Sequence, residues 1–107
     1  MTPSDILDET LTLARQAIAD FEADDGLTLQ ARREGDALKV WAEAGNGHGR
    51  QALGYLAARD DLERSGSAWF LRRALRSLND LYRAGHLPNA PQDVPTEMLR
   101  PPDAYER

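Results

Sequence analysis

The segment from Ser67 to Gly85, SAWFLRRALRSLNDLYRAG, constrains the fold of this chain more than any other stretch. Its apolar residues recur at steps of three and four, a spacing that places them on one broad face of an α-helix. They are Phe70, Leu71, Ala74, Leu75, Leu78, Leu81 and Tyr82. We therefore predict an amphipathic helix over residues 67–84, with its inner face buried in a core.

The outer face of this predicted helix carries Trp69, Arg72, Arg73 and Arg76, which are mutual neighbours at helical spacing. Arginine and tryptophan are residue types that often dominate the binding energy of protein interfaces. We therefore expect this cluster to contact a partner. The competing interpretation is structural: Trp69 turns into the core, and the arginines pair with an acidic first helix.

Charge is divided unevenly along the chain, whose net charge is -5. Residues 1–25 hold seven acidic residues against one arginine, whereas residues 64–86 hold five arginines against one aspartate. Two oppositely charged helices lying near each other would explain this division, and so would a polarised surface that faces a partner. Asp20, Glu22 and Asp24 are the acidic candidates for partner binding.

The N-terminal segment predicts a helix with Thr2 as its N-cap and Pro3 at its first position, reaching about Ala23. Its apolar seam is typical of a helix that packs on its own core. The alternative is a homodimer in which this first helix forms the interface. The seam consists of Leu7, Leu11, Ala14, Ile18 and Phe21, and it is widened by Ile6, Leu13 and Ala17.

The period changes from helical to alternating over residues 27–44. Leu27, Leu29 and Ala31 alternate with polar residues, and the same pattern returns after Gly35. This predicts a β-hairpin with one buried face and with Gly35 in its turn. A helical hairpin is the alternative, because alanine, leucine, glutamate and arginine are good helix formers.

A glycine loop at residues 45–50 precedes a second predicted helix over residues 50–64, and Ser65 and Gly66 end that helix. Ser67 is placed to cap the helix that follows. Five of the six prolines fall in residues 88–107, which predicts an extended tail after a compact domain of residues 1–87. One helical turn is expected at residues 96–99, and the pattern leaves open whether the tail packs on the domain.

These segments together predict an α+β fold that is mainly helical. The expected order is helix, β-hairpin, two helices and an extended proline-rich C-terminal tail. If the hairpin were helical, the fold would instead be an all-α bundle of four or five helices. No motif in the chain is specific enough to carry a family assignment.

Composition narrows the classes of function. The 107 residues suit one domain with one core, and the absence of cysteine excludes disulfides, thiolate nucleophiles and cysteine-ligated zinc. The N-terminal sequence lacks the basic and apolar segments of a signal peptide, and no apolar run approaches membrane-spanning length. We therefore expect a cytoplasmic protein that has no membrane partner.

The sequence lacks catalytic patterns: no nucleophile elbow, no Ser-x-x-Lys and no paired histidines at metal-ligand spacing occur. We expect no cofactor, no metal and no enzymatic activity. The weak anion-binding candidate is the glycine loop, because it precedes a predicted helix N-terminus. Its residues are Gly47, His48, Gly49 and Arg50, and they match neither the P-loop nor the Rossmann spacing.

The leading hypothesis is a non-enzymatic, small acidic protein-binding module: an adaptor, chaperone or inhibitor of a larger protein. The first alternative is a nucleic-acid-associated regulator that uses the basic helix 67–84, although an acidic domain starts from a poor electrostatic position for such binding. The second alternative is a small-anion-binding enzyme at the 45–50 loop.

Overall fold

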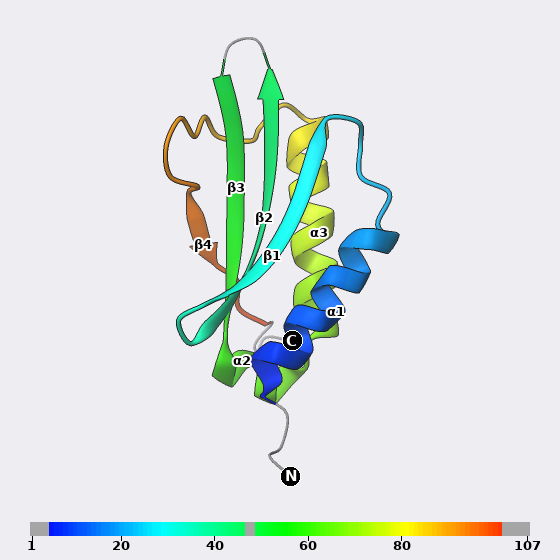
Figure 1. Cartoon of the computed structure of the whole chain (residues 1–107), viewed down its shortest axis with the longest axis vertical. Coiled ribbons are helices and arrows are strands. Elements are labelled where there is room, and N and C mark those ends of the chain that lie inside the picture. Colours follow the sequence, from blue (N-terminus) through cyan, green and yellow to red (C-terminus); the bar gives the residue numbers. More distant parts are fainter. Residues whose placement is uncertain (1–4, 47–48, 102–107) are drawn as a thin grey trace, which may run out of the picture.

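The computed structural model describes residues 5–46 and 49–101 and consists of a twisted sheet with helices packed on one face (Figure 1). The sheet has four strands in the order β1-β2-β3-β4. The first three strands form an antiparallel meander, and β4 pairs parallel with β3. The elements are α1 (Ile6–Asp20), β1 (Leu27–Glu34), β2 (Ala37–Asn46), β3 (Gly49–Ala58), α2 (Arg59–Ser65), α3 (Ala68–Arg83) and β4 (Thr96–Met98).

The predicted β-hairpin is confirmed and consists of β1 and β2. Leu29 lies opposite Ala42 and Ala31 opposite Val40, so the alternating apolar residues of both strands share one face. Gly35 stands in the connection with φ of 60°, a left-handed conformation that glycine adopts without strain. The helical-hairpin alternative is therefore wrong.

The predicted helix over residues 50–64 is wrong, because residues 49–58 form β3 and only residues 59–65 are helical. The expectation of a mainly helical fold fails with it, as does the all-α bundle. Central β3 carries apolar residues on both faces: Leu53 and Tyr55 face the core, while Ala52 and Leu56 face the other way. Without polar alternation, an apolar run of this length does not reveal a strand, and pairing with β2 overrides its helix propensity.

The first helix starts later than predicted. Its N-cap is Asp5, whose Oδ1 accepts a hydrogen bond from the Leu7 backbone N–H at 2.8 Å, and the predicted cap Thr2 lies outside the described residues. Arg59 donates to the same carboxylate at 2.6 Å, and Arg33 lies 3.5 Å from its other oxygen. The cap position is therefore set by long-range ion pairs that local sequence patterns do not reveal.

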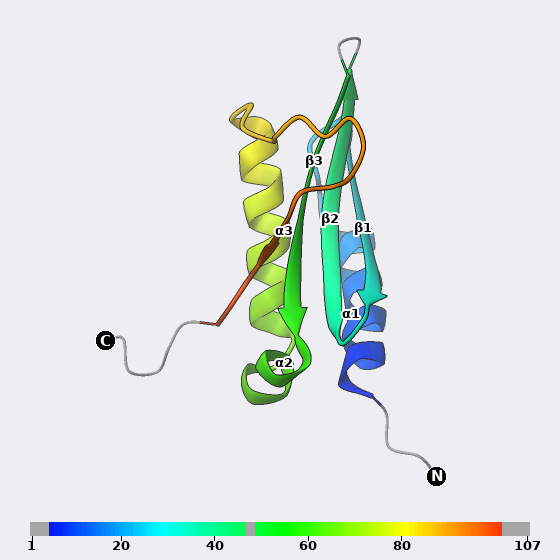
Figure 2. The same cartoon turned by 90° about the vertical axis from the view of Figure 1, so that its left-hand side faces the viewer.

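The predicted helical turn at residues 96–99 is also wrong, because residues 96–98 form β4. Residues 88–99 run along the edge of β3 that is not paired with β2 (Figure 2). The backbone N–H groups of Ala52 and Gly54 donate to the carbonyls of Pro88 and Pro95 at 3.0 and 2.8 Å. Prolines suit this edge position because they lack an N–H to donate.

The core lies between one face of the sheet and two helices, α1 and α3. Figure 2 shows α3 on one side of the strands, as the strong apolar face of the 67–84 segment predicts. The α1 and α3 helices touch through a buried hydrogen bond of 2.6 Å between the hydroxyls of Thr10 and Ser67. The largest fully buried side chains are Phe70, Leu7, Leu38, Leu62, Leu78, Val40 and Thr10.

Candidate functional site

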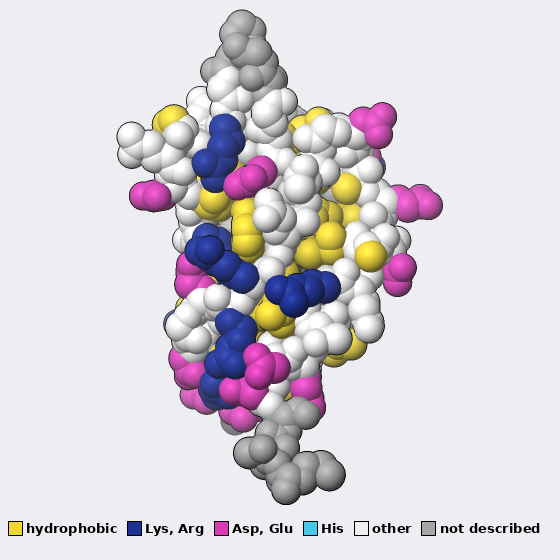
Figure 3. Space-filling model, viewed as in Figure 1, with side chains coloured by type: hydrophobic (Ala, Val, Ile, Leu, Met, Phe, Trp, Pro, Cys, Tyr) yellow, Lys and Arg dark blue, Asp and Glu magenta, His cyan; other side chains and the backbone are white. Residues whose placement is uncertain are grey.

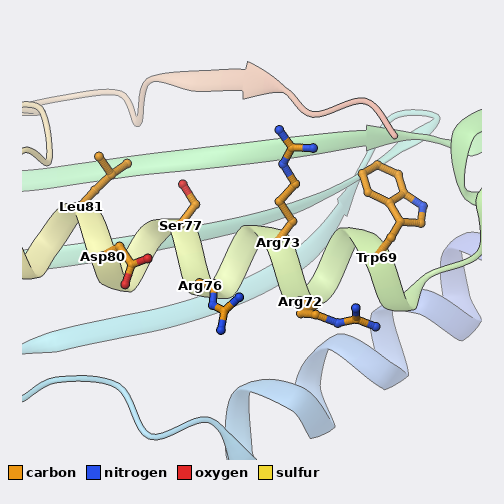
Figure 4. A pocket seen from close by; sticks show the side chains of 7 residues that line it. All are labelled: Trp69, Arg72, Arg73, Arg76, Ser77, Asp80 and Leu81. Carbon is orange, nitrogen blue, oxygen red and sulfur yellow. The ribbon is translucent and has the colours of Figure 1, made fainter. Parts of the chain in front are cut away.

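The predicted contact cluster lies on the outer surface of α3, where two rows of side chains leave the helix (Figure 4). The first row points toward β3 and β4, and the second row lies beside it on the side nearer α1. Together they line a hollow of about 510 Å³, which we call the α3 surface. The first row is Trp69, Arg73, Ser77 and Leu81, and the second is Arg72, Arg76 and Asp80.

The three arginines of the α3 surface are exposed, and none of them forms an ion pair with any described residue. Other arginines do form ion pairs within the chain: Arg32, Arg33, Arg50, Arg59, Arg64 and Arg83. The carboxylates of the acidic N-terminal region that have arginine partners, Asp5, Asp8 and Asp24, bind Arg33, Arg59 and Arg83. The structural interpretation, in which the α3 arginines pair with the first helix, is therefore not seen in the described part of the chain.

Trp69 is partly buried at the end of the α3 surface. Its ring meets Phe70 edge-on, with centroids 5.8 Å apart and an interplanar angle of 68°. Its indole Nε1 is buried and has no acceptor among the described residues. The ring thus packs the N-terminal end of α3 against the core. The part of the Trp69 side chain that is not buried lines the hollow.

A second hollow of about 510 Å³ lies between α1 and α3, which we call the α1–α3 groove. Leu13 stands at this groove with 46% of its surface exposed. The sequence assigned Leu13 to the buried seam, so this groove was missed; only the relative placement of the two helices reveals it. The groove is lined by Leu13, Gln16, Ala17, Asp20, Phe21, Ala68, Leu71, Arg72 and Leu75.

The acidic candidates are separated by the fold. Asp20 lies in the α1–α3 groove together with Arg72, and Glu22 is exposed in the segment after α1. Asp24 is held within the structure, because Arg83 donates to both of its carboxylate oxygens at 3.0 and 3.1 Å. This pairing lowers the pKa of Asp24. The structure therefore places Asp20 in the same groove as Arg72 of α3. Asp24 instead forms an internal ion pair with Arg83.

The glycine loop does not precede a helix. Gly47 and His48 lie outside the described residues, and Gly49 begins β3. Arg50 is engaged within the fold: its Nη2 donates to Glu43 Oε1 and its Nη1 to the Gln92 carbonyl, both at 2.9 Å. The helix N-terminus on which the predicted anion site depended is absent from this position.

The face of the sheet that points away from the helices carries a second aromatic and basic group. Figure 3 shows Lys and Arg side chains gathered in a strip along one face of the molecule. Arg32 and Lys39 lie 5.5 and 5.3 Å from the Trp41 ring centroid. Figure 3 also shows acidic side chains projecting along the side where α1 and the following segment lie. The strand alternation places these three residues on one face, so this group could have been found from the sequence.

Two further findings bear on function. Among the described residues, no group of three or more histidine, aspartate or glutamate side chains could hold a metal ion. None of the helices in the described ranges is long and apolar enough to cross a membrane.

Comparison with known proteins found no matching family model, no matching curated protein and no matching solved structure.

Proposed function

We propose that this protein is a non-enzymatic protein-binding module, acting as an adaptor, chaperone or inhibitor, whose α3 surface receives an acidic segment of a larger cytoplasmic partner. The observation that carries the proposal is the contrast among its arginines. Six of them have carboxylate partners inside the fold, whereas Arg72, Arg73 and Arg76 share one exposed surface and have none among the described residues.

The surface offers both parts of a protein contact. The guanidinium groups of Arg73 and Arg76 can each donate two parallel hydrogen bonds to the oxygens of one carboxylate. Beside them, Trp69 and Leu81 supply apolar area for an anchoring side chain. An aromatic residue with adjacent arginines is the composition found where a few residues dominate binding energy.

The ligand chemistry follows from the charges. A single exposed ion pair contributes only about 0–1 kcal/mol, so charge alone does not hold a partner there. An acidic segment that also places an apolar side chain in the hollow buries apolar area there, and this burial adds binding free energy that the ion pairs alone do not provide. A long polyanion that extends beyond the cluster would, on average, be repelled by the net charge of -5. A short acidic and apolar peptide therefore suits this surface better than a nucleic acid.

Selection from a displayed library of random peptides tests the proposal. Wild-type protein should enrich peptides that combine aspartate or glutamate with a large apolar residue. Arg73→Glu combined with Arg76→Glu should abolish the enrichment. The matched control is Arg15→Glu combined with Arg100→Glu, which changes the net charge equally at two exposed arginines outside the α3 surface and should retain it.

Two results would overturn the proposal. One is enrichment that survives the paired reversal at Arg73 and Arg76, because the binding surface would then lie elsewhere. The other is binding of a single-stranded oligonucleotide, lost in the same variant and tighter than any selected peptide at physiological salt. That second outcome would favour the nucleic-acid alternative.

A further inference from the structure

The α1–α3 groove has walls of opposite charge. Asp20 belongs to the α1 wall and Arg72 to the α3 wall, and apolar side chains of both helices lie between them. Leu13 protrudes at this groove and is one of two large hydrophobic residues that the described chain leaves exposed. The groove therefore presents an acidic wall, a basic wall and a protruding apolar group on one surface.

The two helices run in the same general direction (Figure 1). The hydroxyl contact between Thr10 and Ser67 joins them near one end, and the Asp24 N–H donates to Asn79 Oδ1 at 3.0 Å beyond the other end of α1. A two-fold axis that runs along the groove, in the direction of the two helices, places the α1 wall of one copy opposite the α3 wall of another. Such a contact is isologous, so each favourable interaction occurs twice.

We propose that two copies of this chain associate through their α1–α3 grooves. In this dimer Asp20 of each copy faces Arg72 of the other, and Leu13 of each copy packs on the apolar floor made by Leu71 and Leu75 of the other. A second copy fits because its surface supplies the opposite charge for each wall together with an exposed leucine. This proposal does not depend on the α3 surface binding a peptide, since Arg73 and Arg76 lie outside the groove.

The arrangement has a consequence for the proposed function. Arg72 lines both hollows, so in the dimer it faces Asp20 of the second copy and leaves Arg73 and Arg76 to the peptide. The dimer then carries two α3 surfaces, and a partner with two acidic segments would gain from the linkage between its two binding events.

Sedimentation equilibrium of the full chain, from low micromolar to near-millimolar concentration, tests the dimer. The wild type should associate reversibly. Leu13→Glu should weaken association by about tenfold or more, because the two-fold axis makes each substitution count twice. Arg15→Glu, on α1 but outside the groove, is the matched control and should leave association unchanged. Leu13 is half exposed, so its substitution should leave the helical circular-dichroism signal and the melting temperature almost unchanged.

A charge exchange makes the test specific to the proposed contact. Asp20→Arg and Arg72→Asp should each weaken association, because each places two like charges opposite each other. The double variant Asp20→Arg with Arg72→Asp should restore it, since the walls have only exchanged signs. A wild type that stays monomeric throughout, or a double variant no better than the single ones, would overturn the dimer. Peptide selection repeated on Leu13→Glu reports separately on the α3 surface, so failure of one proposal is distinguishable from failure of the other.

Discussion

The hydrogen bond between Thr10 and Ser67 is the most sharply testable structural contact, because it joins the two helices that form the groove. Its oxygens are 2.6 Å apart, and the Thr10 side chain is 0% exposed. Ser67 occupies the N-cap position of α3, yet its hydroxyl makes no capping bond there and is committed to Thr10. Thr10→Val preserves the shape of the threonine and removes only the hydroxyl, so it leaves the buried Ser67 hydroxyl without its partner.

The expected cost follows from this geometry. A buried polar group left without a partner costs about 1–3 kcal/mol, which is the loss we expect for Thr10→Val. Ser67→Ala should cost less, about 0.5–1.5 kcal/mol, because the Thr10 hydroxyl can turn to a backbone carbonyl of its own helix. The double variant removes both hydroxyls and leaves no buried hydroxyl without a partner. Its loss of unfolding free energy should therefore be smaller than the sum of the two single losses.

Urea unfolding of all four proteins measures the coupling free energy, provided that the dependence on denaturant stays constant across them. Each kcal/mol lost should also lower the melting temperature by about 4–8 °C in a domain of this size. Strict additivity of the two substitutions would refute the reasoning, because it would mean that the hydroxyls do not interact.

The remaining predictions concern a glycine and a helix cap. Gly26→Ala should cost about 1–3 kcal/mol in urea unfolding, since φ is 88° and the new Cβ would lie 2.7 Å from the Tyr82 hydroxyl. Gly85→Ala serves as its control: φ is 76° and, apart from its chain neighbours, no atom lies within 4 Å of the new Cβ, so this substitution should cost only the free energy of placing alanine at positive φ. The hydrogen bond from Arg59 lowers the pKa of Asp5, so the cap's contribution is complete at neutral pH and is lost as pH falls below about 4. Asp5→Asn should therefore be less stable at neutral pH and lose less on acidification; a parallel pH profile would contradict this.

The sequence predicted elements whose polar and apolar residues alternate clearly. The α3 helix buries Phe70 and Leu78 and exposes its arginines, so its helical period is complete in the sequence. The β1–β2 hairpin exposes one face, so its polar and apolar residues alternate with a period of two that can be identified in the sequence. The β3 strand was missed because its two faces are both covered: Leu53 packs on the core, while Gly54 lies against Lys39 and Trp41. A strand with two buried faces loses the alternation by which strands are identified.

The candidate surfaces divide in a similar way. The arginines of the α3 surface are neighbours along one helix, so their clustering can be predicted from their spacing in the sequence. The α1–α3 groove needs Leu13 and Leu75 to be brought together from distant segments, and no local spacing encodes that placement. The same limit explains the wrong start of α1, since Asp5 is fixed by Arg59, which lies 54 residues away in the sequence.

Long-range pairing also explains why a count of arginines cannot locate a binding surface. Arg83 and Arg76 are both exposed members of one helix, yet Arg83 is bound to Asp24, 59 residues earlier in the chain. From the sequence both contribute to one basic segment, whereas in the fold one of them ties the segment after α1 to the end of α3. The arginines available to a partner are those that remain after the internal ion pairs are assigned. Among the arginines of α3 these are Arg72, Arg73 and Arg76, which form no ion pair with any described residue and line the hollow beside Trp69. Unpaired charge and apolar area therefore occur together on this surface, which supports the proposed protein ligand over a purely electrostatic one.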